Sequence, residues 1–311
     1  MRKQPSIEPV LSEDFDAREL TVVPLRHYAQ WVGAVVVLAF LGLVGYIVGS
    51  SKNVEWGVIP GYLTVHAILK GVVVTLEITA VAMLIGTVGG TLIAVMRLSR
   101  NAVLHWVATS YVLVVRSIPQ LVQILMWYNI ALFLPRLGIG SFSVSTNAVI
   151  TPFAAAVLGL GLNEIAYMAE IVRAGILAIE KGQTDAALSL GYTPAQTTWH
   201  IVLPQAMRVI IPPMSNETIG MLKATSLVSV IGASDLLTQA ENISSGNFLV
   251  IELLIVACIW YFILTTIFSV VQYLIERHLA WGANSERSLL ENWLGHLTRL
   301  GHARVVTGGE S

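Results

Sequence analysis

Seven polar side chains that lie within or beside long apolar stretches are the residues of this chain that could do chemistry. They supply a carboxylate, an ammonium group, amides and hydroxyls, so together they could bind both charges of a small polar molecule in a water-filled cavity. Each hydroxyl or amide could instead form a hydrogen bond between helices. The members of this predicted cavity set are Gln123, Asn163, Glu164, Tyr167, Lys223, Thr225 and Ser226.

Catalytic and nucleotide-binding patterns are missing from the sequence. The seven histidines are scattered near the ends of apolar stretches and in the tails, without the spacing of metal ligands. No Gly-x-x-x-x-Gly-Lys-Ser/Thr phosphate loop occurs, so a nucleotide site would have to lie on another chain. The single cysteine, Cys258, lies in an apolar run and allows no disulfide framework. These observations argue against an enzyme.

The elements that position the polar residues must be membrane-spanning helices. Hydrophobic residues make up 55% of the chain and charged residues only 12%, with a mean hydropathy of +0.72. In soluble domains about a quarter of the residues are charged, and about 20 apolar residues suffice to cross the hydrocarbon core. We predict an all-α, polytopic membrane protein with about six transmembrane helices, near 29–49, 71–96, 117–134, 148–172, 208–232 and 248–275.

A polar interval between the fourth and fifth predicted spans has the pattern of a helical hairpin. Asp185 is expected in the first turn of a short helix, where a carboxylate complements free N–H groups. Gly191 is expected to end that helix with a positive φ. Thr193 followed by Pro194 predicts the start of a second helix. The interval therefore predicts a compact knob between two spans.

This loop resembles the coupling motif of the inner-membrane permease subunits of binding-protein-dependent ABC importers. That motif reads Glu-Ala-Ala, three residues, Gly, nine residues, Ile-x-Leu-Pro, and this chain departs from it only by Asp in place of Glu. In the family the loop is the coupling helix, which sits in a groove on the ATP-hydrolysing subunit. The resemblance implies a cytoplasmic coupling helix with the coupling residues Asp185, Ala186, Ala187, Gly191, Ile201, Leu203 and Pro204.

Further blocks resemble the polar amino acid branch of these importers, the histidine, glutamine and arginine type. The blocks start at Gly71, Arg116, Ala166 and Leu222. The chain departs from the family pattern at Ser117 and Ile118, where the family reads closer to Gly-Thr. It departs again where the family commonly has a small residue and this chain has Glu164, and where the family has Asp and this chain has Ala224. The resemblance implies the five-helix type I ABC importer core at residues 62–280, an extra N-terminal helix at 29–49, and cytoplasmic tails at 1–28 and 283–311.

The resemblance also implies what the chain does. We expect a permease subunit that passes a polar amino acid inward while a separate subunit hydrolyses ATP. Its expected partners are a cytoplasmic ABC ATPase dimer, a second permease subunit of the same or a related kind, an extracytoplasmic amino-acid-binding protein and the lipid bilayer, with no nucleic acid. No cofactor is expected on this chain, since ATP and Mg would bind to the ATPase.

Two other functions fit parts of the sequence. An ABC importer permease for another small polar solute would share the coupling loop. A secondary amino acid transporter could use Glu164 or Glu170 to carry a proton, but it would not need the loop around Gly191 and usually has two related halves. No such halves are evident in the sequence.

Four local features carry structural expectations. The segment 101–115 predicts an interfacial helix leading into the third span. Pro212 and Pro213 predict a break in the fifth span. Arg116 is expected to reach the membrane interface, and Glu170 is expected to pair with Arg173 one turn later on the same helix.

The distribution of basic residues predicts the orientation. With the N-terminus inside, Lys52 and Arg136 are the basic residues of the outer loops, while most other Lys and Arg residues lie inside. Basic residues near spans favour the cytoplasmic side. We therefore predict a multi-pass protein of the bacterial cytoplasmic (inner) membrane with both termini in the cytoplasm.

Cysteine labelling in intact cells tests this orientation. We expect cysteines introduced at Ser189 and Ser311 to be shielded from an impermeant thiol reagent, because both positions would face the cytoplasm. A cysteine at Ser141 should label, because it would lie in an outer loop. Strong labelling at Ser189 would overturn the orientation.

Overall fold

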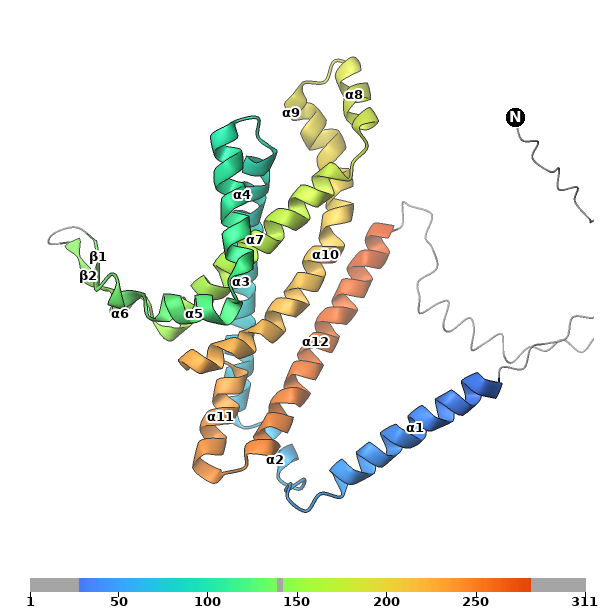
Figure 1. The fold of residues 1–311 in the computed structure, drawn as a ribbon, viewed down its shortest axis with the longest axis vertical. Helices are drawn as coiled ribbons and strands as arrows, with labels where there is room; N and C mark the ends of the chain where they lie inside the picture. The colour runs from blue at the N-terminus through green and yellow to red at the C-terminus, as the bar shows by residue number, and fades with distance from the viewer. Residues whose placement is uncertain (1–27, 139–141, 281–311) are drawn as a thin grey trace, which may run out of the picture. The chain divides into compact units, whose positions relative to one another are not determined.

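The computed structural model describes residues 28–138 and 142–280, and nearly all of this part of the chain is helical (Figure 1). Helix α1 (Tyr28–Gly49) belongs to one unit, residues 1–54, and is described by itself. The second unit begins at Glu55 and contains all the other elements. Apart from Tyr28, the predicted tails 1–28 and 283–311 lie outside the described residues.

The second unit is built from helices and one very short hairpin. Strands β1 and β2 pair antiparallel, with Arg136 opposite Ser145. The elements, in chain order, are α2 (Ile59–Leu63), α3 (His66–Leu98), α4 (Ala102–Ser117), α5 (Gln120–Tyr128), η1 (Ile130–Leu132), β1 (Arg136–Leu137), β2 (Val144–Ser145), α6 (Thr146–Val149), α7 (Pro152–Leu177), α8 (Lys181–Ser189), α9 (Pro194–Thr197), η3 (Thr198–Val202), α10 (Leu203–Ala224), η4 (Thr225–Ile231), α11 (Leu236–Asn247) and α12 (Val250–Ala280).

Six segments of the described chain have the length and composition of membrane spans. Helices α1, α3, α7 and α12 are each long and apolar enough to cross a membrane alone. Two bent pairs complete the set: α4 with α5, bent by 99°, and residues 194–231 with α11, bent by 43°. Counting each pair as one span confirms the all-α fold with about six transmembrane helices.

The third span differs from its prediction. It begins with α4 at Ala102, not at residue 117, and the chain turns sharply at Ile118–Pro119 into α5. The predicted interfacial helix at 101–115 is therefore wrong, because α4 packs along the bundle (Figure 1). Val112 is buried against α7, and the Tyr111 hydroxyl donates to the Leu162 carbonyl oxygen at 2.7 Å. Tertiary packing, rather than the polar ends of this segment, decides its place.

Helices α3 and α7 pack together at glycines, at the centre of the second unit. A Cβ added at Gly86 would lie 2.8 Å from Glu164 Cβ, and one at Gly90 would lie 2.8 Å from the Ala169 backbone nitrogen. Small residues four apart let two membrane helices approach until their backbones almost touch. The Gly86 and Gly90 pair therefore sets the distance between α3 and α7.

A second cluster joins α3 to α11 and α12. Ile68 and Val72 of α3 are buried with residues of α10, α11 and α12. The Thr75 hydroxyl accepts a hydrogen bond from the Leu236 N–H at 3.1 Å, and Asp235 caps the start of α11 by accepting from the next two free N–H groups of that helix. Backbone groups at this bend are thus satisfied within the protein, as an apolar surrounding requires.

Helix α10 continues through Pro212 and Pro213, so the predicted break there is wrong. Each proline removes one N–H donor from the helix, but packing holds the helix in place. Ile210 is buried against Ala94 of α3 and Val172 of α7. Membrane helices tolerate proline where neighbouring helices support the backbone in this way.

Gly159 provides a test of the bundle. Its missing Cβ would lie 2.8 Å from the Ile124 Cα, so Gly159→Val should push α5 away from α7 and lower the free energy of unfolding by roughly 1–3 kcal/mol, as overpacked cores do. Gly246→Ala is the matched control, because nothing lies within 4 Å of a Cβ at Gly246. Thermal unfolding of the purified protein measures both, and equal stability of the two variants would contradict this packing.

Candidate functional site

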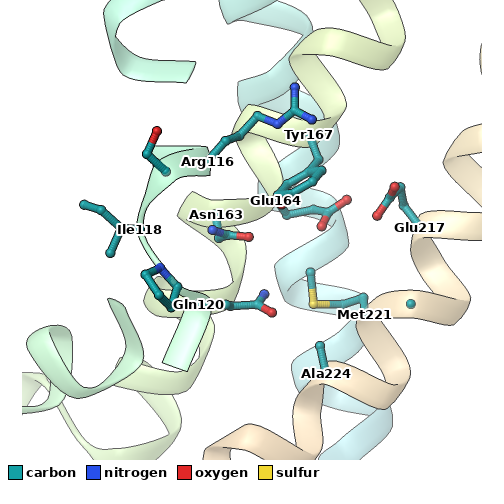
Figure 2. A pocket seen from close by; sticks show the side chains of 12 residues that line it. Arg116, Ile118, Gln120, Asn163, Glu164, Tyr167, Glu217, Met221 and Ala224 are labelled. Carbon is teal, nitrogen blue, oxygen red and sulfur yellow. The ribbon is translucent and has the colours of Figure 1, made fainter. Parts of the chain in front are cut away.

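A cavity of ≈ 470 Å³ lies where the α4–α5 bend faces α7 and α10. Figure 2 shows its side chains converging from these three sides. Its volume is within the usual range of about 300–1,000 Å³ for small-molecule sites. The lining residues are Arg116, Ser117, Ile118, Pro119, Gln120, Asn163, Glu164, Tyr167, Glu217, Gly220, Met221 and Ala224.

The α4–α5 bend forms one wall because a proline follows α4. Ile118 has φ −98° and ψ 129°, the extended conformation favoured before a proline. The helix end leaves backbone carbonyl oxygens without intrahelical donors. The Gln123 side-chain amide donates to two of them, Val115 at 2.8 Å and Ile118 at 3.0 Å. Gln123, one of the predicted cavity residues, is thus placed behind the bend as a brace and outside the lining.

Helix α7 supplies the buried polar wall. Asn163 and Glu164 are only 5% and 4% exposed, and Tyr167 follows one turn later. The Arg116 guanidinium carbon lies 4.9 Å from the centre of the Tyr167 ring, a cation–π contact. The Glu164 Oε1 atom is buried and has no hydrogen-bond partner among the described residues. The structure therefore brings together three of the predicted residues and adds Arg116, which lines the cavity rather than only reaching the membrane interface.

Helix α10 supplies the third wall through Glu217, Gly220, Met221 and Ala224. Three other predicted cavity residues follow on the same stretch but lie outside the lining. The Lys223 side chain is exposed, the Thr225 hydroxyl donates to the Leu222 carbonyl oxygen at 2.7 Å, and the Ser226 hydroxyl donates to the Lys223 carbonyl oxygen at 2.8 Å. Residues at 217, 220, 221 and 224 share one helical face. Lys223 lies off this face, and Thr225 and Ser226 belong to η4, where the helix has changed its winding.

Arg116 and Glu217 are lining residues that the predicted set lacks. Pro119 could have pointed to Arg116 as a lining residue. A proline ends the helix that precedes it, so the side chains just before it lie at a helix break. Glu217 has the weaker signal of a charge within a predicted span, where charges usually mark function. Which face of α10 it occupies depends on the packing.

A separate ion cluster lies beside the cavity. Glu170 accepts from both Arg173 and Arg97, which confirms the predicted Glu170–Arg173 pair and adds a partner from α3. A second cavity of ≈ 470 Å³ reaches from Arg97 and Glu170 to Arg116 and Tyr167. The cluster therefore ties α3 to α7 at one end of the first cavity.

The predicted knob forms at the end of α7. Helix α8 ends in a Schellman motif: Gly191 has φ +88°, its N–H donates to Leu188 at 3.0 Å, and the Tyr192 N–H donates to Ala187 at 3.1 Å. Thr193 and Gln196 then form a capping box at the start of α9. The positive φ at Gly191 and the helix start at Thr193–Pro194 are thus as predicted.

The position of Asp185 within α8 differs from its prediction. Helix α8 begins at Lys181, so Asp185 lies in the second turn, too far from the free N–H groups to complement them. Asp185 and Ala186 are exposed, Ala187 is buried, and Ile201, Leu203 and Pro204 lie where η3 passes into α10. Leu190 is 80% exposed and Trp199 68% exposed. The knob therefore presents apolar side chains and a carboxylate on its surface.

Comparison with known proteins identifies the family. Residues 86–281 match the family described as the binding-protein-dependent transport system inner membrane component. The chain belongs to this family. As an inner membrane component it is a multi-pass transport permease subunit, and its relatives belong to ABC importers.

Individual relatives are also permeases or transporters. The permease is 38% identical to the arginine transport system permease protein ArgU of Corynebacterium glutamicum, over 88% of this chain and 87% of that protein. It is 37% identical to the glutamate/aspartate import permease protein GltK of Escherichia coli, over 68% of this chain and 93% of that one. A crystal structure of an amino acid ABC transporter with histidines matches with a TM-score of 0.61 and 39% identity, over 68% of this chain and 94% of that chain.

Gly191→Val tests the turn of the knob. A branched side chain at a positive φ should add strain of about 1–2 kcal/mol, so the amide hydrogens of residues 187–193 should exchange faster with solvent. Gly182→Ala in α8 is the control, because its Cβ meets nothing within 4 Å and its φ is not positive. Equal exchange in both variants would show that the turn does not depend on glycine.

Proposed function

We propose that this permease imports an amino acid through the cavity between the α4–α5 bend, α7 and α10. The observation that carries the proposal is the meeting of one guanidinium, Arg116, with buried acidic and amide groups of α7 in a single cavity. An amino acid zwitterion needs both kinds of partner within a few ångströms. The relatives named for arginine and for glutamate/aspartate transport support an amino acid as the cargo.

The recognition follows from the charges on the two sides of the cavity. The Arg116 guanidinium binds the α-carboxylate, for which its planar fork of N–H donors is suited. Glu164 accepts from the α-ammonium group, and Asn163 supplies further hydrogen bonds beside it. Asn163 and Glu164 are buried, and hydrogen bonds to buried groups are stronger than hydrogen bonds in bulk water.

Coupling to ATP hydrolysis takes place at the knob. The exposed Leu190 and Trp199 side chains are large apolar groups that a protein partner would cover. In the proposed complex, this partner is an ABC ATPase that holds ATP and Mg, and the predicted coupling residues around Asp185 and Gly191 transmit its motion to α7 and α10. Helices α8 and α9 join these two helices directly, so movement of the knob moves two walls of the cavity.

The complete importer contains further proteins. We propose two permease subunits, of the same or a related kind, an ATPase dimer in the cytoplasm and an amino-acid-binding protein outside. Both termini of the permease lie in the cytoplasm in this arrangement, together with the knob. The family description names a binding-protein-dependent system, which supports the external partner.

Uptake by liposomes that contain the permease, its ATPase and its binding protein tests the proposal. Arg116→Gln should lower amino acid uptake about tenfold or more, because a charge-assisted hydrogen bond contributes about 1.5–3 kcal/mol. Arg100→Gln is the matched control, since Arg100 is exposed and lies outside the cavity. Equal uptake by the two variants, or ATP-driven uptake of a solute that is not an amino acid, would refute the proposal.

The same liposomes test the coupling surface. Gly191→Val should reduce uptake while the permease remains in the membrane at normal abundance. Unchanged uptake together with unchanged co-purification of the ATPase would remove the knob from coupling.

A further inference from the structure

The charges that line the cavity do not balance. Glu164 and Glu217 supply two carboxylates, whereas Arg116 supplies one cation. A neutral amino acid carries one positive and one negative group, which match one carboxylate and the guanidinium. One carboxylate is left over.

The two carboxylates face the same space from different helices. Figure 2 shows Glu164 on α7 and Glu217 on α10 pointing toward each other, with Arg116 on the side of the α4–α5 bend. The Glu217 carboxylate also lies over Gly220, which offers it no donor side chain. A ligand between the helices would contact both acids at once.

The protein supplies no second cation at this place within the described residues. Glu170 lies outside the cavity lining, and both ion pairs among the described residues are formed by its carboxylate with Arg97 and Arg173. The Lys223 side chain is exposed and is not part of the cavity lining. Arg116 lies over the Tyr167 ring. The described residues therefore offer the second carboxylate no cationic partner, and a positive group of a ligand would fill that role.

The Glu164 side chain packs against a glycine of α3. The side chain is buried, and its Oε1 atom has no hydrogen-bond partner among the described residues. Its Cβ and Cγ fill the space that a Cβ at Gly86 would occupy on α3. A buried carboxylate oxygen without a donor is costly unless a ligand supplies the donor. Gly86 is thus a positioning residue for Glu164.

We infer that the cavity selects an amino acid with a cationic side chain, whose two positive groups meet Glu164 and Glu217 while its α-carboxylate meets Arg116. This inference rests on the proposed function and specifies its substrate class. The ligand then carries two positive charges and one negative charge, the reverse of the cavity. A neutral ligand leaves one acid unpaired, and an acidic ligand adds a repelled carboxylate.

Direct binding to the purified permease–ATPase complex tests the inference, without the binding protein, whose own selectivity would otherwise hide that of the cavity. The probes are radiolabelled arginine and unlabelled lysine, glutamine and glutamate as competitors. We expect arginine and lysine to bind about tenfold or more tightly than glutamine, and glutamate to bind most weakly.

Single neutralised variants should remove this preference selectively. In Glu164→Gln and in Glu217→Gln one carboxylate remains for the α-ammonium group, so arginine affinity should fall toward that of glutamine while glutamine affinity changes little. Glu77→Gln is the control, because Glu77 is an exposed carboxylate on α3 outside the cavity. An unchanged arginine-to-glutamine ratio in both cavity variants would overturn the inference.

Gly86→Ala separates position from charge. It should displace the Glu164 side chain and lower the arginine-to-glutamine ratio although both carboxylates remain. Gly161→Ala changes the same α3–α7 interface, but its Cβ would meet only side-chain atoms of Ile85, at 3.2 Å or more, and not Glu164, so it should keep the ratio of the parent protein. An equal ratio in the two glycine variants would remove Gly86 from its role.

The outcomes distinguish this inference from the proposed function. If glutamine or glutamate binds as tightly as arginine to the parent complex, the cationic selectivity is wrong and amino acid import stands. If no amino acid of any class binds or competes, the proposed function itself fails.

Discussion

The close contact of α3 with α7 is the constraint on which the rest of the second unit depends. Gly86 and Gly90 bring the two backbones together, and this fixes where α7 can present its polar residues. Helix α4 then packs on the outer side of the same pair through Val112 and Tyr111. If the glycines were larger, α7 would move outward and the buried carboxylate of Glu164 would lose its place.

Polar groups are used sparingly in this bundle, and most are tied to the backbone. The Gln123 amide donates to carbonyl oxygens at the end of α4, and the Thr75 hydroxyl accepts from the N–H at the start of α11. Such pairing is what an apolar surrounding demands of every helix break. The cavity departs from this rule, since the Glu164 Oε1 atom has no hydrogen-bond partner in the part of the chain that the structure describes. A polar group that the protein itself does not satisfy is a natural place for a ligand.

Helices connect the knob and the cavity on both sides. Helix α7 leads from Glu164 to α8, and α9 leads through η3 into α10 and to Glu217. The knob is held by local hydrogen bonds, the Schellman motif at Gly191 and the capping box at Thr193, and by packing of α8 against α9 and η3, which buries Ala187 and Thr197. It can therefore act as a stiff handle whose displacement changes the separation of α7 and α10. The prolines of α10 lie between the two ends and leave fewer backbone hydrogen bonds to resist bending.

Local features of this protein were determined by the sequence itself. Long apolar runs predicted the helical membrane fold, because a backbone in lipid must satisfy its own hydrogen bonds. The turn at Gly191, the helix start at Thr193–Pro194 and the Glu170–Arg173 pair also followed from neighbouring residues, since each involves partners within one or two turns.

Only the tertiary structure decided how distant residues meet. It placed α4 in the bundle, carried α10 through its two prolines, and chose which polar residues of α10 face the cavity. It also brought Arg116 from the α4–α5 bend to Tyr167 and set Glu217 opposite Glu164 (Figure 2). The physical reason is that the rotation of a helix about its axis depends on the shape of its neighbours. Side-chain sizes at helix crossings fix that rotation, and no single segment of the sequence contains both sides of a crossing.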